Sequence, residues 1–191
     1  MAITKLTTSG VNNIVKYDSF LAGNPPADFG GYWPIASATG TGSSGTITFS
    51  SIPSTYKHLQ IRGVYYDGGY NLNLQMNGDT GSNYSRHILN GNGTSVSSSG
   101  AASQTSIDLG SYGADVTNNM SICVIDILDY SSTTKNKTVR ALSGFNGSSN
   151  QVWVASGLWM STSAITSISI LDIYGSYNTN TQFALYGIKE A

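Results

Sequence analysis

Apolar and polar residues alternate with a period of two along most of the chain beyond residue 35. Leu72, Leu74 and Met76 alternate with asparagine and glutamine, which predicts a strand with one buried face. Residues 120–128 (MSICVIDIL) are apolar at both odd and even positions, which predicts a central strand buried on both faces. Similar patterns predict the remaining strands, at residues 46–49, 59–65, 83–89, 137–145, 151–160, 165–174 and 182–189.

Many short strands without intervening helical patterns favour an all-β fold built as an antiparallel β-sandwich. About nine strands in a chain of this length suit a jelly-roll-like sandwich, and a simpler immunoglobulin-like sandwich is the alternative. Residues 91–106 (GNGTSVSSSGAASQTS) are polar and of low complexity, so we expect a surface loop there or a segment that fills an interface.

The first 34 residues differ from the rest, and we expect a short helical or extended segment there. Pro25-Pro26 prevents a helix from continuing. Four apolar residues in this segment fall near one helical face and form a stripe. The stripe is too small to fold alone, so it must lie on the body of the protein or on a partner. We therefore predict an attachment segment and linker over 1–34 and a β-sandwich domain over 35–191. The candidate anchor residues are Val11, Ile14, Val15 and Leu21.

Charged residues make up only 10% of the chain and the net charge is −1, with both signs scattered. No basic stripe is present, so nucleic acid is not an expected partner. A protein with so little net charge is poorly protected from aggregation by electrostatic repulsion between its copies. This property suits a chain that forms part of an assembly. The single cysteine, Cys123, excludes an internal disulfide and is expected to be a buried, inert thiol. No apolar run approaches the roughly 20 residues of a spanning helix, so we expect no membrane insertion.

Residues suited to catalysis or metal binding are sparse. His58 and His87 have no second ligand at metal spacing, so we interpret them as sheet-surface or hydrogen-bonded side chains. Asp126 and Asp129 have opposite parities on one strand and would point to opposite faces, which does not support a paired-carboxylate site. We predict no catalytic residues and no enzymatic activity.

A polar turn at residues 77–83 offers several oxygen atoms. Asp79, with Asn77 and Asn83, could hold Ca²⁺, but the spacing is not that of an EF-hand. A turn closed by the aspartate side chain is the favoured interpretation. We therefore predict neither a metal nor a cofactor.

Aromatic residues are the more informative set. Trp153 and Trp159 share one parity and are expected in the core. Tyrosines beside asparagine and aspartate can bind sugars or protein surfaces, and the alternative is that they line a subunit interface. The candidates for a surface, ligand or interface role are Tyr65, Tyr66, Tyr70, Tyr174 and Tyr177.

Several motifs together carry a resemblance to a known class of proteins. They are ITFSSIPSTYKHLQIR (47–62), MNGD (76–79) with GSNY (81–84), DILDY (126–130), SGLWM (156–160), FALYGIK (183–189) and, near the start, KYDSFLAGN (16–24). The chain resembles tail-fibre-like and other structural proteins of phage virions, notably those of cyanophages, over nearly its whole length. The resemblance implies an exposed, oligomeric β module and supplies no catalytic residues.

From this resemblance we expect a structural protein of the phage tail: a short tail fibre, a fibre tip or an adaptor. The alternative is a capsid decoration or cement protein that stabilises the phage head. The expected partners are other virion proteins, copies of the chain itself in a homotrimer, and a glycan or protein of the host surface. We expect the chain to be made in the bacterial host cytoplasm and to end in the phage particle.

Overall fold

In the computed structural model, the described residues are 31–65, 72–110, 120–145, 150–173 and 175–189. This part of the chain contains strands and no helix, which confirms the all-β prediction. The strands are β1 (Trp33–Thr39), β2 (Thr46–Phe49), β3 (His58–Tyr65), β4 (Leu72–Met76), β5 (Tyr84–Gly91), β6 (Val96–Gln104), β7 (Ile107–Asp108), β8 (Ser121–Leu128), β9 (Lys137–Phe145), β10 (Gln151–Trp159), β11 (Ile168–Asp172) and β12 (Gln182–Ile188).

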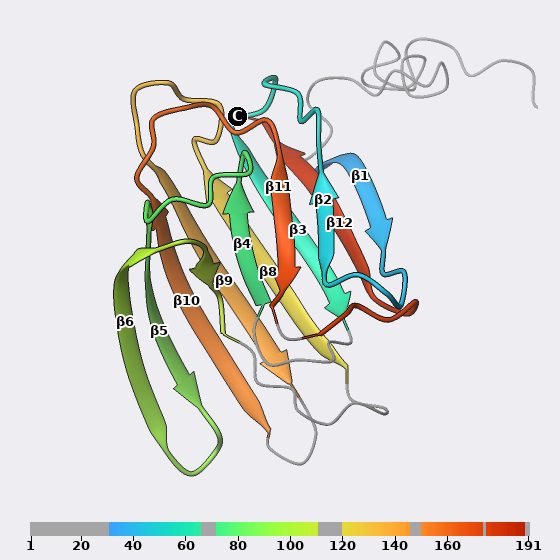
Figure 1. The fold of residues 1–191 in the computed structure, drawn as a ribbon, viewed down its shortest axis with the longest axis vertical. Coiled ribbons are helices and arrows are strands. Elements are labelled where there is room, and N and C mark those ends of the chain that lie inside the picture. The colour runs from blue at the N-terminus through green and yellow to red at the C-terminus, as the bar shows by residue number, and fades with distance from the viewer. Residues whose placement is uncertain (1–30, 66–71, 111–119, 146–149, 174, 190–191) are drawn as a thin grey trace, which may run out of the picture. The chain divides into compact units, whose positions relative to one another are not determined.

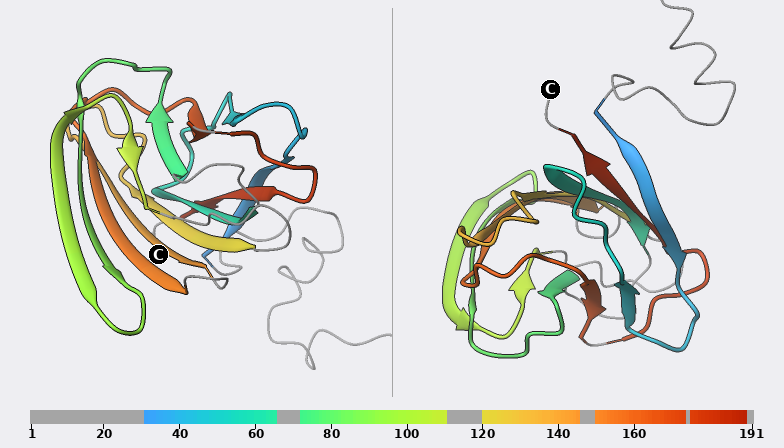
Figure 2. Two further views of the ribbon diagram at one scale, coloured as in Figure 1. Left: turned by 60° about the horizontal axis from the view of Figure 1, so that its bottom comes forward. Right: turned by 90° about the horizontal axis from the view of Figure 1, so that it is seen from above.

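The strands form two antiparallel sheets that pack as a sandwich (Figure 1). The larger sheet has eight strands in the order β1-β12-β3-β8-β9-β10-β5-β6, and the smaller has four in the order β2-β11-β4-β7. Figure 2 shows the larger sheet curving around the smaller one. We call the side of the larger sheet that faces the smaller sheet its inner face, and the opposite side its outer face.

The chain winds between the two sheets in a regular way. It passes from β2 in the smaller sheet to β3 in the larger, back to β4, and on to the β5–β6 hairpin of the larger sheet. It then visits β7, the β8–β9–β10 meander, β11 and β12, changing sheets at each step. This is the winding of a double-sheet jelly roll, with the meander in the place of one central strand. An immunoglobulin-type sandwich has strands ABED facing CFG, which does not match this order.

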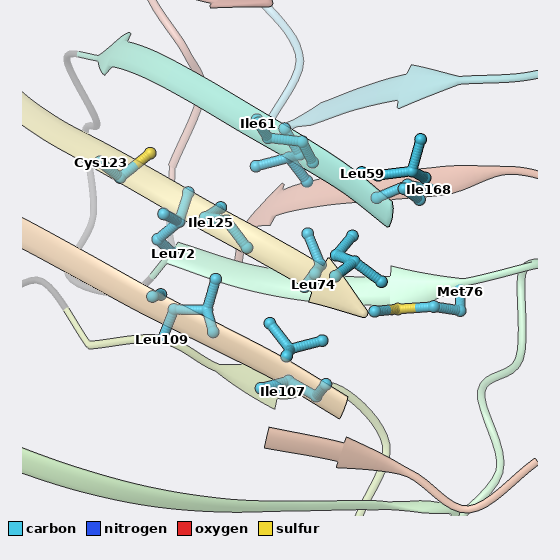
Figure 3. Packing of buried hydrophobic residues seen from close by; sticks show 14 of the residues in the cluster. Leu59, Ile61, Leu72, Leu74, Met76, Ile107, Leu109, Cys123, Ile125 and Ile168 are labelled. Atoms are coloured by element: carbon cyan, nitrogen blue, oxygen red, sulfur yellow. The ribbon is translucent and has the colours of Figure 1, made fainter. Parts of the chain in front are cut away.

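The core lies between the two sheets and is made by every second residue of the strands. Figure 3 shows Leu59 and Ile61 of β3 and Ile125 of β8 on one side of it, with Leu74 and Met76 of β4 on the other. All five side chains are completely buried. Burying one such side chain contributes roughly 1.5–3 kcal/mol, so the alternating pattern is the main source of the stability of the sandwich.

The prediction that residues 120–128 are buried on both faces is wrong. Along β8, Cys123, Ile125 and Ile127 are buried, whereas the alternate side chains are exposed. Ile122 retains 54% of its accessible surface and Leu128 retains 42%. The pattern misled because, among the described residues, only the inner face of the larger sheet is covered by another layer.

The prediction of a surface loop over residues 91–106 is also wrong, because residues 96–104 form strand β6. This strand pairs with β5 alone and forms one edge of the larger sheet. Main-chain hydrogen bonds hold an edge strand of this kind, so small polar side chains such as Ser97, Ser98 and Ser99 do not prevent it from forming. Its side chains are mostly exposed, as the polar composition indicates.

Candidate functional site

Two of the tyrosines proposed for a surface role belong to the core. Tyr65 and Tyr177 have no exposed surface. Their rings lie 5.7 Å and 5.6 Å from the ring of Phe183, measured between centroids. Tyr65 shares its parity with Leu59 and Ile61, so the same alternation that builds the core also turns its ring inward. The surface role predicted for these two residues is therefore corrected.

The remaining sequence-based candidates divide into two groups. Trp153 and Trp159 are buried, with 6% and 3% of their surface exposed, which confirms the core prediction. The other candidates lie outside the described residues: the anchor residues Val11, Ile14, Val15 and Leu21, and the tyrosines Tyr66, Tyr70 and Tyr174.

The polar turn between β4 and β5 is organised by the Asp79 carboxylate. Its Oδ1 accepts the Gly81 N–H at 2.8 Å, and its Oδ2 accepts the indole N–H of Trp159 at 2.7 Å. Asn83 Nδ2 donates to both oxygens, at 3.2 Å and 3.0 Å. These bonds, that of Trp159 first, lower the pKa of Asp79. The Asn77 side chain instead bonds to the backbone of residues 164–167, so the turn interpretation is confirmed.

The two carboxylates at the end of β8 have separate partners. Asp126 accepts from Arg140 at 2.9 Å and from Gln60 at 2.7 Å. Asp129 pairs with Lys135 at 2.8 Å, and the hydrogen bond from this lysine is the main cause that lowers the pKa of Asp129. Its backbone N–H donates to Nδ1 of His58. Each carboxylate is therefore held by its own basic or polar partners, and the two do not form a shared site.

Cys123 is buried between the sheets, and this burial raises the pKa of its thiol to about 12. Within the described ranges, no group of three or more His, Cys, Asp or Glu side chains is placed to hold a metal ion. The same part of the chain has no helix long and apolar enough to cross a membrane.

The most distinctive surface of the molecule is an apolar band on the outer face of the larger sheet. The register aligns its members in two adjacent rows that run across the strands. Each member keeps at least 36% of its surface exposed. One row contains Val64, Ile122, Val152 and Val96, and the other contains Val124, Leu142, Val154 and Leu89.

A row of polar residues borders the apolar band. Arg62 donates to Gln60 at 2.7 Å, Gln60 donates to Asp126 at 2.7 Å, and Arg140 donates to the other oxygen of Asp126 at 2.9 Å. The chain of bonds crosses β3, β8 and β9 and fixes these side chains against the sheet. The outer face therefore combines an apolar band with a preorganised polar margin.

An aromatic cluster extends this margin toward the edge of the sheet. The Arg62 guanidinium lies 4.6 Å from the ring centre of Tyr32 and 5.5 Å from that of Tyr186. The two rings meet edge to face, with their centres 6.4 Å apart. Sequence reasoning missed this cluster, because Tyr32 and Tyr186 are distant in sequence and meet only through the pairing of β1 with β12.

The outer face is hollowed at two places beside the band. A hollow of about 660 Å³ lies over β5, β6 and β10, where His87, Ser98 and Val154 contribute to its walls. A second of about 410 Å³ lies over β1, β12, β3 and β8, beside Val64 and Ile122. An exposed apolar band with adjoining hollows is typical of a surface that another molecule covers.

Sequence reasoning missed the band, although its signal was present. The apolar residues at both parities in 120–128 were assigned to a strand buried within the chain, and Val152 and Val154 show the same pattern beside Trp153.

Comparisons with protein-family models, curated proteins and solved structures found no match.

Proposed function

We propose that this chain is a structural protein of a phage virion, an oligomeric β-sandwich of the tail such as a short tail fibre, fibre tip or adaptor. The observation that carries the proposal is the apolar band, because a structural subunit needs a surface that copies or neighbours can cover. The sequence resemblance to virion proteins described above gives the setting. In this proposal the chain binds and positions other molecules and catalyses no reaction.

The size of the outer face suits a stable contact. Eight strands at a spacing of about 4.8 Å, with about 3.4 Å per residue along each strand, give a face on the order of 1,000 Å². A standard protein interface needs about 800 Å² from each partner. Contiguous apolar patches of this kind are rare on proteins that stay monomeric. The face can therefore supply a full interface without a contribution from any other part of the chain.

The charge of the outer face favours contact with a second copy. Among the outward-facing side chains of β3, β5, β6, β8, β9 and β10, the formally charged ones are Arg62, Asp126 and Arg140. Asp126 and Arg140 are paired at 2.9 Å. Two copies can therefore approach without strong like-charge repulsion, and closed symmetry would bury the band in every subunit. The number of three copies comes from the sequence-based expectation of a homotrimer, not from the charge of this face.

Purified particles of the encoding phage provide the test of this function. We expect mass spectrometry to find the chain in particles purified away from cell debris, and a reconstruction to place it at the tail. Density on the head would favour the decoration role. Absence from purified particles would contradict the proposal. Release of reducing ends from host surface polysaccharide by the purified chain would contradict the non-enzymatic part.

A further inference from the structure

A second surface lies on the inner face of the larger sheet, at the end that the smaller sheet does not cover. Figure 1 shows β5, β6 and β10 continuing past the ends of β4 and β11. A hollow of about 350 Å³ lies there, between the β5–β6 hairpin, β7 and β10. This volume lies within the range of small-molecule sites, about 300–1,000 Å³. We call this hollow the inner groove.

Two buried apolar side chains lie at the bottom of the inner groove, and the surface that the groove exposes is mostly polar. Ile88 and Trp153 line it, and only 4% and 6% of their surfaces are exposed. The six-membered ring of Trp153 lies against Gly110, where a Cβ would come within 2.3 Å of the ring. Gly110 has a φ of +71°, a conformation that favours glycine. The main chain therefore packs on the tryptophan ring and fixes its position.

The charged groups of the inner groove neutralise one another. Arg86 Nε lies 3.3 Å from Asp108 Oδ2, and Arg86 also donates to the Ser99 hydroxyl at 3.1 Å. Asp108 Oδ1 accepts the Gly110 N–H at 2.9 Å. The pair presents no net charge, so a formally charged ligand would meet no free opposite charge. These contacts favour a neutral ligand.

The remaining polar groups suit hydroxyl groups. Asn90 accepts a hydrogen bond from Ser97 through Oδ1, and an amide also carries two donor hydrogens. Gln151 Oε1 is buried and accepts no hydrogen bond from any described residue. Buried polar atoms are nearly always paired in folded proteins, so the Gln151 amide has hydrogen-bonding capacity left for a ligand hydroxyl if its side chain turns toward the groove.

We propose that the inner groove binds a neutral glycan. Sugar hydroxyls both donate and accept, which matches the amides of Asn90 and Gln151 and the serine hydroxyls of this mostly polar lining. This site is separate from the apolar band, on the opposite face of the same sheet. Glycan binding would give the proposed virion protein a way to hold a host surface, and in this respect the inference rests on the proposed function. Binding in the groove itself does not require that copies of the chain assemble through the apolar band.

Calorimetric titration of the full chain tests the proposal. The probes are short neutral oligosaccharides of glucose, galactose, mannose and N-acetylglucosamine, with uronic-acid oligosaccharides as the charged comparison. We expect at least one neutral series to bind saturably and the uronic acids to bind more weakly. Gln151→Ala and Asn90→Ala should each raise the Kd about five-fold, the effect of losing one hydrogen bond. Gln182→Ala, which removes an exposed glutamine of β12 outside the groove, should leave the Kd unchanged.

Three results would overturn the proposal: no binding of any neutral series, tighter binding of the uronic acids, or unchanged affinity in both groove variants. Thermal unfolding of each variant shows whether it is folded. A band variant, Leu142→Asn, should retain the wild-type Kd. Loss of glycan binding and loss of assembly are therefore separate outcomes, and a failure of this proposal leaves the proposed function to its own test.

Discussion

The two faces of the larger sheet carry nearly the same kind of side chain and differ in what covers them. On β8, Ile125 of the inner face is completely buried, whereas 54% of the surface of Ile122 on the outer face is exposed. The inner face packs on the smaller sheet, and the outer face has no covering layer among the described residues. Apolar residues at both parities therefore identify a strand with two contact faces, of which the second can be covered by another molecule.

The largest expected effect comes from breaking the inner face. Ile125→Ala removes a completely buried side chain and leaves a cavity between the sheets. We expect it to lower the free energy of unfolding by about 2–5 kcal/mol. Denaturant titration of both proteins measures the difference. A loss as small as that of an exposed substitution would show that this position is not part of the core.

A pair of glycines sharpens the comparison between the faces. On the inner face, a Cβ at Gly63 would lie 2.3 Å from the Phe183 ring and 3.2 Å from the Cys123 sulfur. On the outer face, the atom nearest to a Cβ at Gly144 is 3.9 Å away. Gly63→Ala should destabilise the protein by about 1–3 kcal/mol through overpacking, and Gly144→Ala should not. Thermal melting curves of the two variants make the comparison, and equal shifts would contradict it.

A substitution at Asp79 tests how much the polar contacts of the turn between β4 and β5 contribute to stability. Asp79→Ala removes the acceptor of the Trp159 indole and should cost about 1–2 kcal/mol, since the carboxylate is partly exposed. Folding lowers the pKa of Asp79 below 3.8, its value in the unfolded chain, so the ionised carboxylate stabilises the fold above that pH. The difference between wild type and variant should be constant near neutral pH and shrink as the pH falls below 3.8. Denaturant titrations of both proteins across this pH range measure the difference in the free energy of unfolding. A difference that grew as the pH fell would contradict the role given to the ionised Asp79 carboxylate.

Much of the fold was accessible from the sequence, because alternation reports which residues share a face. The alternation at 72–76 and 151–160 predicted β4 and β10, and the core positions of Trp153 and Trp159 followed from their shared parity. Strand β6 was missed because an edge strand is held by main-chain bonds and shows no apolar pattern. The turn at Asp79 could be predicted because its contacts with Gly81 and Asn83 are local.

The candidate surfaces were less accessible, because they depend on the register between distant strands. The apolar band exists because Val124 lies opposite Leu142, and Leu142 lies opposite Val154. The inner groove joins residues of β5, β6, β7 and β10 that show no common pattern. Tyr65 shares the parity of the core residues Leu59 and Ile61, but its polar neighbours in the sequence favoured a surface role. Tyr177 lies between β11 and β12, where no strand alternation reports the direction of a side chain.

The smallest expected effect on stability comes from the outer face. Leu142→Asn at the centre of the apolar band should change the free energy of unfolding of the single chain by no more than about 0.5 kcal/mol, because its side chain is 54% exposed. Thr138→Asn, on the outer face of the same strand but outside the band, is the matched control. Chemical denaturation at high dilution measures both, and a core-sized loss for Leu142→Asn would contradict the exposed position.

The molar mass of the full chain in solution tests the central claim most directly. Sedimentation velocity at micromolar concentration should give the wild-type protein three times the 20.1 kDa chain mass. The Leu142→Asn variant should sediment at the mass of one chain, and Thr138→Asn should behave as wild type. A wild-type protein that stays at the mass of one chain, or a Leu142→Asn variant that keeps the oligomeric mass, would contradict the claim that the apolar band is covered by copies of this chain.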